Sequence, residues 1–276
     1  MAYFETDGGR RVKYEHYRGA GTPVVLVHGW GMAGKVWVSV IEGLIREGHE
    51  VVVIDQRGCG RSDRDFADVS VSANAGDVVA IVGALGLRPA VINGWSLGGA
   101  IAVEAAHRLG ASAAGLMLTC GATPRLTSAA DFPYGAEPGS YAGLGEALLA
   151  DRAGFFAGIA QGTCARDMGP ATVAWLHAMF MDGAPMLYTS LAAVETLDQR
   201  TLLGKLAVPV LSIVGGKDAI VSPDVGRQVL AFARNARIAE FADCGHAPFL
   251  EEPAAYLAVL LDFVAECDRD LPGGRQ

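Results

Sequence analysis

The sequence of 276 residues predicts an α/β protein whose mostly parallel sheet is covered by helices on both faces. Short apolar runs of strand length alternate along the chain with longer segments in which apolar residues recur at helical spacing. Several of these runs are apolar throughout, as expected for strands that are buried on both faces. A hydrophobic content of 51% fits such a fold, and a chain of this length can form a substantial core.

The first 120 residues supply most of the predicted sheet. Two short strands are expected in residues 1–18, around the turn Asp7-Gly8-Gly9. Further strands are predicted at residues 23–27, 51–54, 90–92 and 115–119. The helices between them are predicted at residues 36–47, 69–85 and 97–109. This order of elements is typical of a doubly wound sheet, in which functional residues lie at the carboxyl ends of the strands.

The alternation stops after Cys120, and no strand is evident again before residue 208. The best helix candidates in this stretch are residues 141–158, 171–181 and 185–197. We therefore predict a helical cap at residues 121–197, inserted before the last two strands of the sheet. Residues 1–120 and 198–276 would then form the core domain.

The last part of the chain returns to the earlier pattern. Strands are expected at residues 208–214 and 237–241, and a final helix at 253–267. Between the strands, Ser222 and Pro223 have the residue types of an N-cap and first helical position, so a helix is expected up to residue 232. Residues 268–276 are expected to be frayed.

The segment from Gly94 to Gly98 has the pattern G-x-S-x-G between a predicted strand and a predicted helix. In this pattern the strand turns sharply into the helix, with the serine at the apex in a strained conformation. The glycines are small because backbone crosses backbone there. Ser96 is therefore the candidate nucleophile, although a serine at this position could also simply cap the helix.

A serine nucleophile needs a base to take its proton and an acid to orient that base. Asp218 and His246 each follow one of the last two predicted strands, so both are expected at the same edge of the sheet as Ser96. Asp218 could instead form a turn or cap. Asp243 and Asp224 are rival acids, but Asp243 is too close to His246 in sequence and Asp224 lies in the first turn of a helix.

Two backbone amides are candidates for binding the oxyanion of a tetrahedral intermediate. The amide of Leu97 directly follows the candidate nucleophile, and the amide of Trp30 lies in the loop after the strand at 23–27. His28, in the same loop, is interpreted as a structural histidine that supports it.

Several aromatic residues are candidates for lining a substrate pocket, although an aromatic stripe on a cap helix is equally compatible with packing inside the cap. The candidates are Trp95, Trp175, Phe180, Tyr188 and Phe249.

Charge and composition exclude several classes of partner. A net charge of −8 argues against nucleic acid and anionic membranes, and no apolar run is long enough for a membrane span. The five cysteines are scattered and form no C-x-x-C pair, which predicts neither a metal site nor disulfides, and no cofactor is expected. The N-terminus lacks the pattern of a signal peptide, so a cytoplasmic protein is expected.

Taken together, the motifs resemble the α/β-hydrolase fold of serine hydrolases over about residues 3–266. The matching segments are His28-Gly-Trp-Gly31, Asp55-Gln-Arg-Gly-Cys-Gly-Arg-Ser62, Gly94-Trp-Ser-Leu-Gly-Gly99, Gly216-Lys-Asp218 and Gly245-His246. The resemblance implies a catalytic triad in the chain order Ser96, Asp218, His246.

Within this superfamily, His28-Gly-Trp-Gly31, Gly94-Trp-Ser-Leu-Gly-Gly99 and His246-Ala-Pro-Phe249 are together similar to the carboxylesterases that demethylate pimeloyl-carrier-protein methyl ester. The motif set is also similar to bacterial arylesterases. That similarity implies ester hydrolysis, with Trp30 and Leu97 as oxyanion donors. One feature departs from it. Residues 121–200 contain four arginines, no lysine and eight acidic residues, a net charge of −4 that would repel an acidic carrier protein. The segment from Asp55 to Ser62 resembles proline iminopeptidases, but their elbow differs.

The sequence is therefore interpreted as a metal-free serine esterase that acts on a small, largely apolar ester or lactone through an acyl-Ser96 intermediate. A hydrolase of carbon–carbon bonds in vinylogous diketones is the alternative within enzymes, because it uses the same triad and cap. A ligand receptor on the same scaffold is the alternative outside enzymes. The oligomeric state and the physiological substrate stay open.

Overall fold

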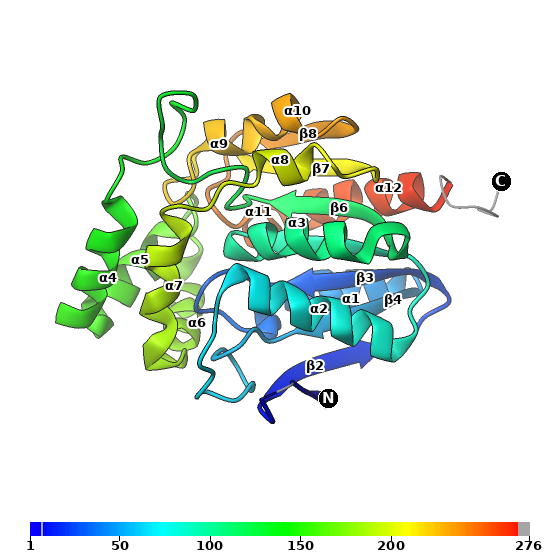
Figure 1. Cartoon of the computed structure of the whole chain (residues 1–276), viewed down its shortest axis with the longest axis horizontal. Helices are drawn as coiled ribbons and strands as arrows, with labels where there is room; N and C mark the ends of the chain where they lie inside the picture. The colour runs from blue at the N-terminus through cyan, green and yellow to red at the C-terminus, as the bar shows by residue number, and fades with distance from the viewer. Residues whose placement is uncertain (7, 270–276) are drawn as a thin grey trace.

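The computed structural model describes residues 1–6 and 8–269, and it contains the expected doubly wound sheet (Figure 1). Eight strands form one sheet in the order β1-β2-β4-β3-β5-β6-β7-β8. The strands are β1 (Ala2–Glu5), β2 (Arg11–Tyr17), β3 (Gly21–Val27), β4 (His49–Ile54), β5 (Ala90–Trp95), β6 (Ala113–Thr119), β7 (Val210–Gly215) and β8 (Ala236–Phe241). Strands β3 to β8 run parallel, and β1 and β2 are antiparallel at one edge. The predicted fold class is confirmed. Residue 7 of the expected first turn and residues 270–276 of the expected frayed end lie outside the described residues.

Helices cover both faces of the sheet and bury an apolar core on each (Figure 1). On one face lie α2 (Val71–Leu85) and α3 (Leu97–Leu109), which pack against each other. On the other face lie α1 (Val38–Arg46) and α12 (Pro253–Arg269), which also contact each other. The central strands are buried along their whole length, which is why their sequences are apolar without alternation. None of the described helices is both long and apolar enough to cross a membrane.

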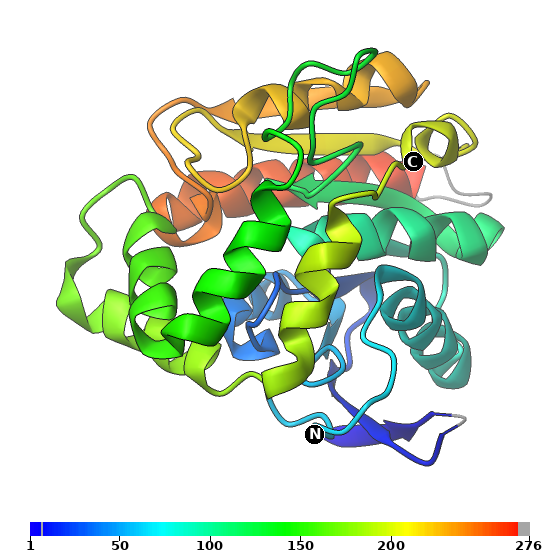
Figure 2. The ribbon, with the colours of Figure 1, turned by 60° about the vertical axis from the view of Figure 1, so that its left-hand side comes forward.

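Between β6 and β7 the chain leaves the sheet and forms a group of helices beyond the carboxyl ends of the strands (Figures 1 and 2). This four-helix insertion consists of α4 (Ser140–Ala150), α5 (Arg152–Gly162), α6 (Gly169–Met181) and α7 (Tyr188–Val194). Helix α4 packs along α7, and α5 packs along α6. The insertion therefore lies over the edge of the sheet to which the loops after the strands project.

Two predicted helices are each divided in the structure. The stretch expected as one helix at 141–158 is broken at Asp151, whose backbone is not helical and whose carboxylate accepts a hydrogen bond from the Gly154 amide. This is the N-cap arrangement that aspartate favours, and it starts a second helix. The helix after Ser222 divides into α9 (Pro223–Arg227) and α10 (Val229–Phe232). Ser222 is at the N-cap position, but its carbonyl rather than its hydroxyl accepts from the Val225 amide.

Candidate functional site

Ser96 lies at the turn between β5 and α3 in a conformation that side-chain-bearing residues rarely adopt. Its φ is 56° and its ψ is −124°. The Ser96 amide donates to the Thr119 carbonyl (3.0 Å), and the Ser96 carbonyl accepts from the Gly99 and Ala122 amides (both 2.8 Å). These three bonds tie the turn to α3 and to the end of β6. They hold the strained backbone in place, so the side chain is fixed at the carboxyl edge of the sheet.

The two glycines that flank this turn are required by close backbone approaches. A Cβ at Gly94 would collide with the Gly98 carbonyl, and a Cβ at Gly98 would collide with the carbonyls of Val27 and His28. The strand, the turn and the start of α3 are therefore packed closely enough to exclude any side chain at either position.

Asp218 follows β7 and His246 follows β8, and the structure brings their side chains together. The Nδ1 of His246 is 2.7 Å from Oδ2 of Asp218, and the two residues are 2% and 8% exposed. The other carboxylate oxygen of Asp218 accepts from the amides of Ile220 (2.8 Å) and Val221 (3.0 Å). Because both of its oxygens are occupied, the carboxylate has a fixed orientation. It binds the imidazole through Nδ1 and leaves Nε2 without a bond to Asp218.

The backbone of His246 is anchored as firmly as its ring. Its amide donates to the Thr163 carbonyl (2.8 Å), and its carbonyl accepts from Nε1 of Trp95 (2.7 Å). Trp95 immediately precedes Ser96, so this bond links the two loops that carry the candidate nucleophile and the candidate base.

A buried carboxylate joins the histidine loop to the four-helix insertion. Oε1 of Glu251 accepts from the Gly245 amide (2.7 Å), and Oε2 accepts from the amides of Ala165 and Arg166 (both 2.9 Å). Glu251 is 7% exposed. It therefore connects the residue before His246 to the segment that follows α5, through three charge-assisted bonds.

Cys120 directly follows β6 and, like Ser96, has a positive φ, of 44°. Burial, followed by the negative charge of Asp218, raises the pKa of the Cys120 thiol well above its usual value, so the thiol stays protonated. The ligand atoms of Cys120, Asp218 and His246 all lie within 4.8 Å of one another, the one such group among residues 1–6 and 8–269. These are the residues that could hold a metal ion, but the carboxylate and the imidazole are already bonded to each other.

The two predicted oxyanion donors lie beside Ser96. Trp30 and Leu97 line the same pocket as Ser96, and the Leu97 amide stands at the N-terminus of α3. Neither amide donates a hydrogen bond to another described residue. Both amides therefore have no competing partner among the described residues, and the dipole of α3 favours negative charge at its N-terminus.

His28 supports the loop that carries Trp30, as the sequence predicts. Its ring is fully buried, Nδ1 donates to the Gly29 carbonyl (2.8 Å), and Nε2 accepts from the Gln56 amide (3.0 Å). Burial lowers the pKa of His28, in agreement with a neutral ring that donates at one nitrogen and accepts at the other. His28 is thus a fixed connection between the ends of β3 and β4.

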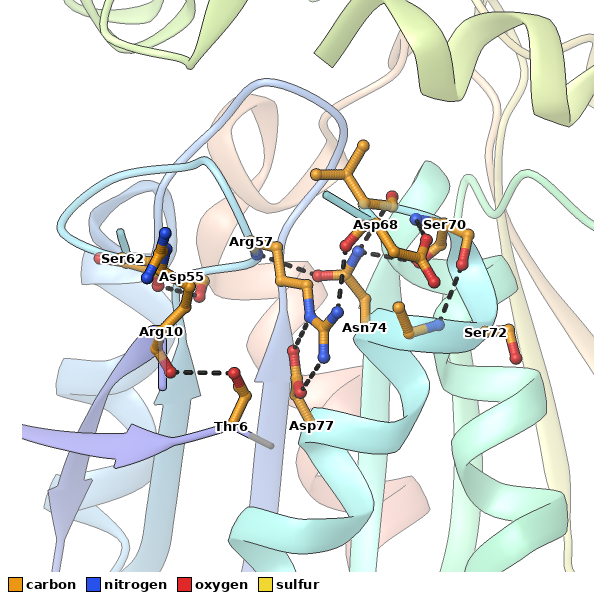
Figure 3. Close-up of polar contacts among 12 residues, drawn as sticks. Thr6, Arg10, Asp55, Arg57, Ser62, Asp68, Ser70, Ser72, Asn74 and Asp77 are labelled. Atoms are coloured by element: carbon orange, nitrogen blue, oxygen red, sulfur yellow. Dashed lines mark hydrogen bonds and ion pairs between the residues drawn. The ribbon is translucent and has the colours of Figure 1, made fainter. Parts of the chain in front are cut away.

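The segment from Asp55 to Ser62, after β4, holds neighbouring loops in position rather than lining the pocket. The Asp55 carboxylate accepts from the amides of Gly34 (2.7 Å) and Arg61 (3.0 Å). Figure 3 shows Arg57 reaching α2, where its guanidinium pairs with Asp77 and its amide donates to the Asn74 side chain. These contacts give the segment from Asp55 to Ser62 a structural role.

The pocket at the carboxyl edge of the sheet contains Ser96 and His246 and is otherwise mostly apolar. Its core-domain side is formed by Gly29, Trp30, Trp95, Leu97, Ile220 and Val221. Its remaining lining residues, from the segment between β6 and β7, are Ala122, Leu126, Tyr141, Leu144, Phe155, Ile159, Thr163, Phe180, Leu191 and Val194. Among the described residues, no lysine, arginine, aspartate or glutamate lines this pocket.

Two of the five predicted pocket residues, Trp95 and Phe180, line this pocket, and three do not. Phe249 is fully buried in the core against Trp37 and Trp95. Trp175 is partly buried against the apolar cluster to which residues of the insertion contribute, and Tyr188 is 38% exposed on α7. The sequence does not indicate which neighbour an aromatic residue on a helix contacts. Phe249 and Trp175 contact apolar residues inside the protein and not the pocket.

Comparison with known proteins places these features among hydrolases. Residues 24–259 match the model of the α/β hydrolase family. The chain is 33% identical over 256 residues to the pimeloyl-[acyl-carrier protein] methyl ester esterase of Stenotrophomonas maltophilia, covering 90% of this chain and 94% of that protein. It also resembles the solved esterase of Exiguobacterium antarcticum, with a TM-score of 0.91 and 25% identity over 95% of this chain and 98% of that one. The structure of Est816, described as an N-acyl homoserine lactone degrading enzyme, matches with a TM-score of 0.80 and 26% identity over 95% of this chain and 100% of that one.

Proposed function

The chain belongs to the α/β hydrolase family, and we propose that it is a serine esterase cleaving a small, largely apolar carboxylic ester or lactone. The observation that carries the proposal is the buried hydrogen bond between His246 and Asp218, in a pocket that also contains Ser96 at its strained turn. Serine is a weak nucleophile on its own, and an imidazole oriented by a carboxylate is the arrangement that activates it. The relatives that are named as esterases support the same reaction class.

In the proposed mechanism the Ser96 hydroxyl attacks the ester carbonyl while Nε2 of His246 takes its proton. Asp218 keeps the proton on Nδ1 and stabilises the imidazolium that forms. The amides of Trp30 and Leu97 bind the negative oxygen of the tetrahedral intermediate. His246 then gives its proton to the leaving alcohol, and an acyl-Ser96 ester remains. Water activated by His246 hydrolyses this ester and restores the serine.

The lining of the pocket supports an uncharged substrate. Within residues 1–6 and 8–269 no lysine or arginine lines it, so a carboxylate on the substrate would find no ion partner among them and would lose its hydration. The inserted segment 121–200 has a net charge of −4, which disfavours an acidic carrier protein as the docking partner. An apolar acyl chain or a lactone ring meets neither obstacle. The match to Est816, at 26% identity, supports including lactones.

A panel of p-nitrophenyl esters of increasing chain length, together with simple lactones, tests the proposal. The wild-type protein is expected to hydrolyse short and medium esters, and Ser96→Ala is expected to abolish turnover while the circular dichroism spectrum stays unchanged. Ser112→Ala is the matched control, because Ser112 is exposed before β6. A serine-directed phosphonate should label the wild type and Ser112→Ala but not Ser96→Ala.

Two outcomes would contradict the proposal. Undiminished ester hydrolysis by Ser96→Ala would remove the assigned nucleophile. No ester or lactone turnover by the wild type would favour the other interpretations, with cleavage of a vinylogous diketone pointing to a carbon–carbon hydrolase. A protein that is inactive on all of these substrates, and that still binds them, would be a receptor.

A further inference from the structure

Besides Ser96, one residue of the pocket carries a hydroxyl that no described residue hydrogen-bonds. Tyr141, in the first turn of α4, lines the pocket together with Ser96 and His246. Its hydroxyl makes no hydrogen bond to another described residue, whereas its backbone amide does. Tyr141 is only half-buried, and its hydroxyl is not among the buried atoms without a partner, so it is open to water in the free protein and can exchange that water for an atom of a ligand.

The other polar side chains of the pocket already have partners. Nε1 of Trp30 donates to the Leu187 carbonyl and the Ser190 hydroxyl. Nε1 of Trp95 donates to the His246 carbonyl, and the Thr163 hydroxyl donates to the Ile159 carbonyl. Apart from Ser96 and His246, Tyr141 is therefore the one lining residue within 1–6 and 8–269 whose side chain has a donor available to a ligand.

The position of Tyr141 is fixed by a carboxylate on the neighbouring helix. Glu195, directly after α7, accepts from the amides of Gly139 (2.6 Å) and Tyr141 (3.1 Å) with its two oxygens. This contact holds the start of α4 against the end of α7, the helix pair that lies side by side over the sheet in Figure 2. The ring of Tyr141 also packs against buried apolar residues. The phenol is thus held in place before any ligand arrives.

Tyr141 can act only as an uncharged donor or acceptor. Burial, followed by the negative charges of Glu195 and Asp218, raises the pKa of Tyr141 to about 12. The hydroxyl therefore keeps its proton at neutral pH. The same two negative charges disfavour an anionic group beside it, so the group that it binds is expected to be a neutral oxygen.

We propose that Tyr141 donates a hydrogen bond to a second oxygen of the substrate, so that the substrate is a neutral ester or lactone with an additional acceptor such as a keto or ether oxygen. This inference rests on the proposed function. It extends that function from apolar esters in general to esters with two oxygen functions, one at Ser96 and one at Tyr141. Tyr141 then determines specificity, and the bond cleavage itself does not depend on it.

Tyr141→Phe, which removes only the hydroxyl, tests this with matched substrates. The plain substrate is methyl hexanoate, and its partners are the methyl esters of 3-, 4- and 5-oxohexanoic acid, which place a keto oxygen at successive distances from the ester. For wild type, at least one oxo ester should have a higher kcat/KM than methyl hexanoate. Tyr141→Phe should lower kcat/KM for that oxo ester about tenfold and leave methyl hexanoate within about twofold, because only one of the two uses the hydroxyl.

The control is Tyr188→Phe, which removes the hydroxyl of an exposed tyrosine outside the pocket and should change neither substrate. An equal loss on both substrates in Tyr141→Phe would mean that the hydroxyl only supports the fold, and the proposal would be overturned. It would also be overturned if no oxo ester responded to the substitution. Hydrolysis of methyl hexanoate that requires Ser96 would in either case leave the esterase proposal standing. If the wild type hydrolysed neither series, both proposals would fail.

Discussion

The imidazole of His246 is bonded through Nδ1 to Oδ2 of Asp218 at 2.7 Å, and this contact is buried beneath the four-helix insertion. Its geometry assigns one oxygen of Asp218 to the histidine and the other to the amides of Ile220 and Val221. The carboxylate is thus oriented by the backbone of its own loop, and the imidazole takes its orientation from the carboxylate.

Asp218→Asn should lower kcat by about 10⁴-fold on any ester that the wild type hydrolyses. The asparagine oxygen can still accept from the Ile220 and Val221 amides, so its NH₂ group would face Nδ1 and favour the tautomer with the proton on Nε2. That tautomer cannot take a proton from Ser96. Steady-state kinetics, with thermal melting as the check on folding, provide the measurement.

Asp243→Asn is the control for this substitution. Asp243 lies three residues before His246, is exposed, and pairs with the equally exposed Lys217. Solvent screens such a surface pair, so both activity and stability should stay close to the wild type. A large loss of activity in Asp243→Asn with none in Asp218→Asn would reverse the assignment of the acid.

Glu251→Gln should both destabilise the protein and slow the reaction. The glutamine oxygen can replace the acceptor of Ala165 and Arg166, but its NH₂ group would then face the Gly245 amide, donor against donor. One unsatisfied buried amide costs about 1–3 kcal/mol. Because Gly245 directly precedes His246, a shift of this loop should lower kcat, by up to about 10²-fold.

The neighbouring substitution Glu252→Gln separates this effect from a general loss of acidic charge. Glu252 pairs with Arg166 and is partly exposed, so its loss should shift the melting temperature little. Chemical denaturation and kcat for the two variants give the comparison. Equal behaviour of Glu251→Gln and Glu252→Gln would show that the buried bonds of Glu251 do not position the histidine loop.

Helix α3 illustrates what the sequence determines well. The sequence predicts this helix at residues 97–109, and the structure has it at Leu97–Leu109. Its start is fixed by the tight turn at Ser96 and its end by Gly110, which has a positive φ of 54°. Both boundaries depend on the conformational preferences of a few neighbouring residues, and these preferences can be predicted from the sequence. The prediction of one continuous helix at 141–158 is wrong for a related reason: Asp151 caps a new helix within a continuous helical pattern.

The sequence does not reveal the partners of residues whose role depends on tertiary contacts, such as Tyr141, Glu251 and Cys120. Each depends on a contact between segments that are distant along the chain, such as the bond from the Ala165 amide to Glu251, 86 residues later. A glutamate before the last helix and a tyrosine in an alanine-rich stretch have no pattern that points to a partner. The proximity of Asp218 and His246, by contrast, can be predicted from the sequence. Parallel strands end at one edge of the sheet, so the order of the strands alone brings the loops after them together.

A pair of glycine substitutions tests the close packing of the elbow. Gly98→Ala should lower the free energy of unfolding by about 3–5 kcal/mol, because the new Cβ would collide with the carbonyls of Val27 and His28. Gly158→Ala should raise it by about 0.5–1 kcal/mol, because Gly158 is exposed within α5 and a Cβ there meets no atom within 4 Å. Denaturant unfolding of both variants measures the two changes. A Gly98→Ala variant as stable as the wild type would contradict the backbone crossing described for the elbow.

The state of His28 can be measured directly. Its ring should stay neutral, with the proton on Nδ1, at pH values where an ordinary histidine of pKa 6.5 is mostly charged, because burial lowers its pKa. Nuclear magnetic resonance of the ring nitrogens between pH 7.5 and about 5 reports both tautomer and charge, and His28→Asn identifies the signal.

In the unfolded chain the same ring takes up a proton near pH 6.5, so the unfolded state binds more protons below that value. The contribution of His28 to stability is therefore complete above about pH 6.5 and is lost as the pH falls below it. A His28 signal that titrates at 6.5 in the folded protein would contradict the buried, neutral ring that connects the ends of β3 and β4.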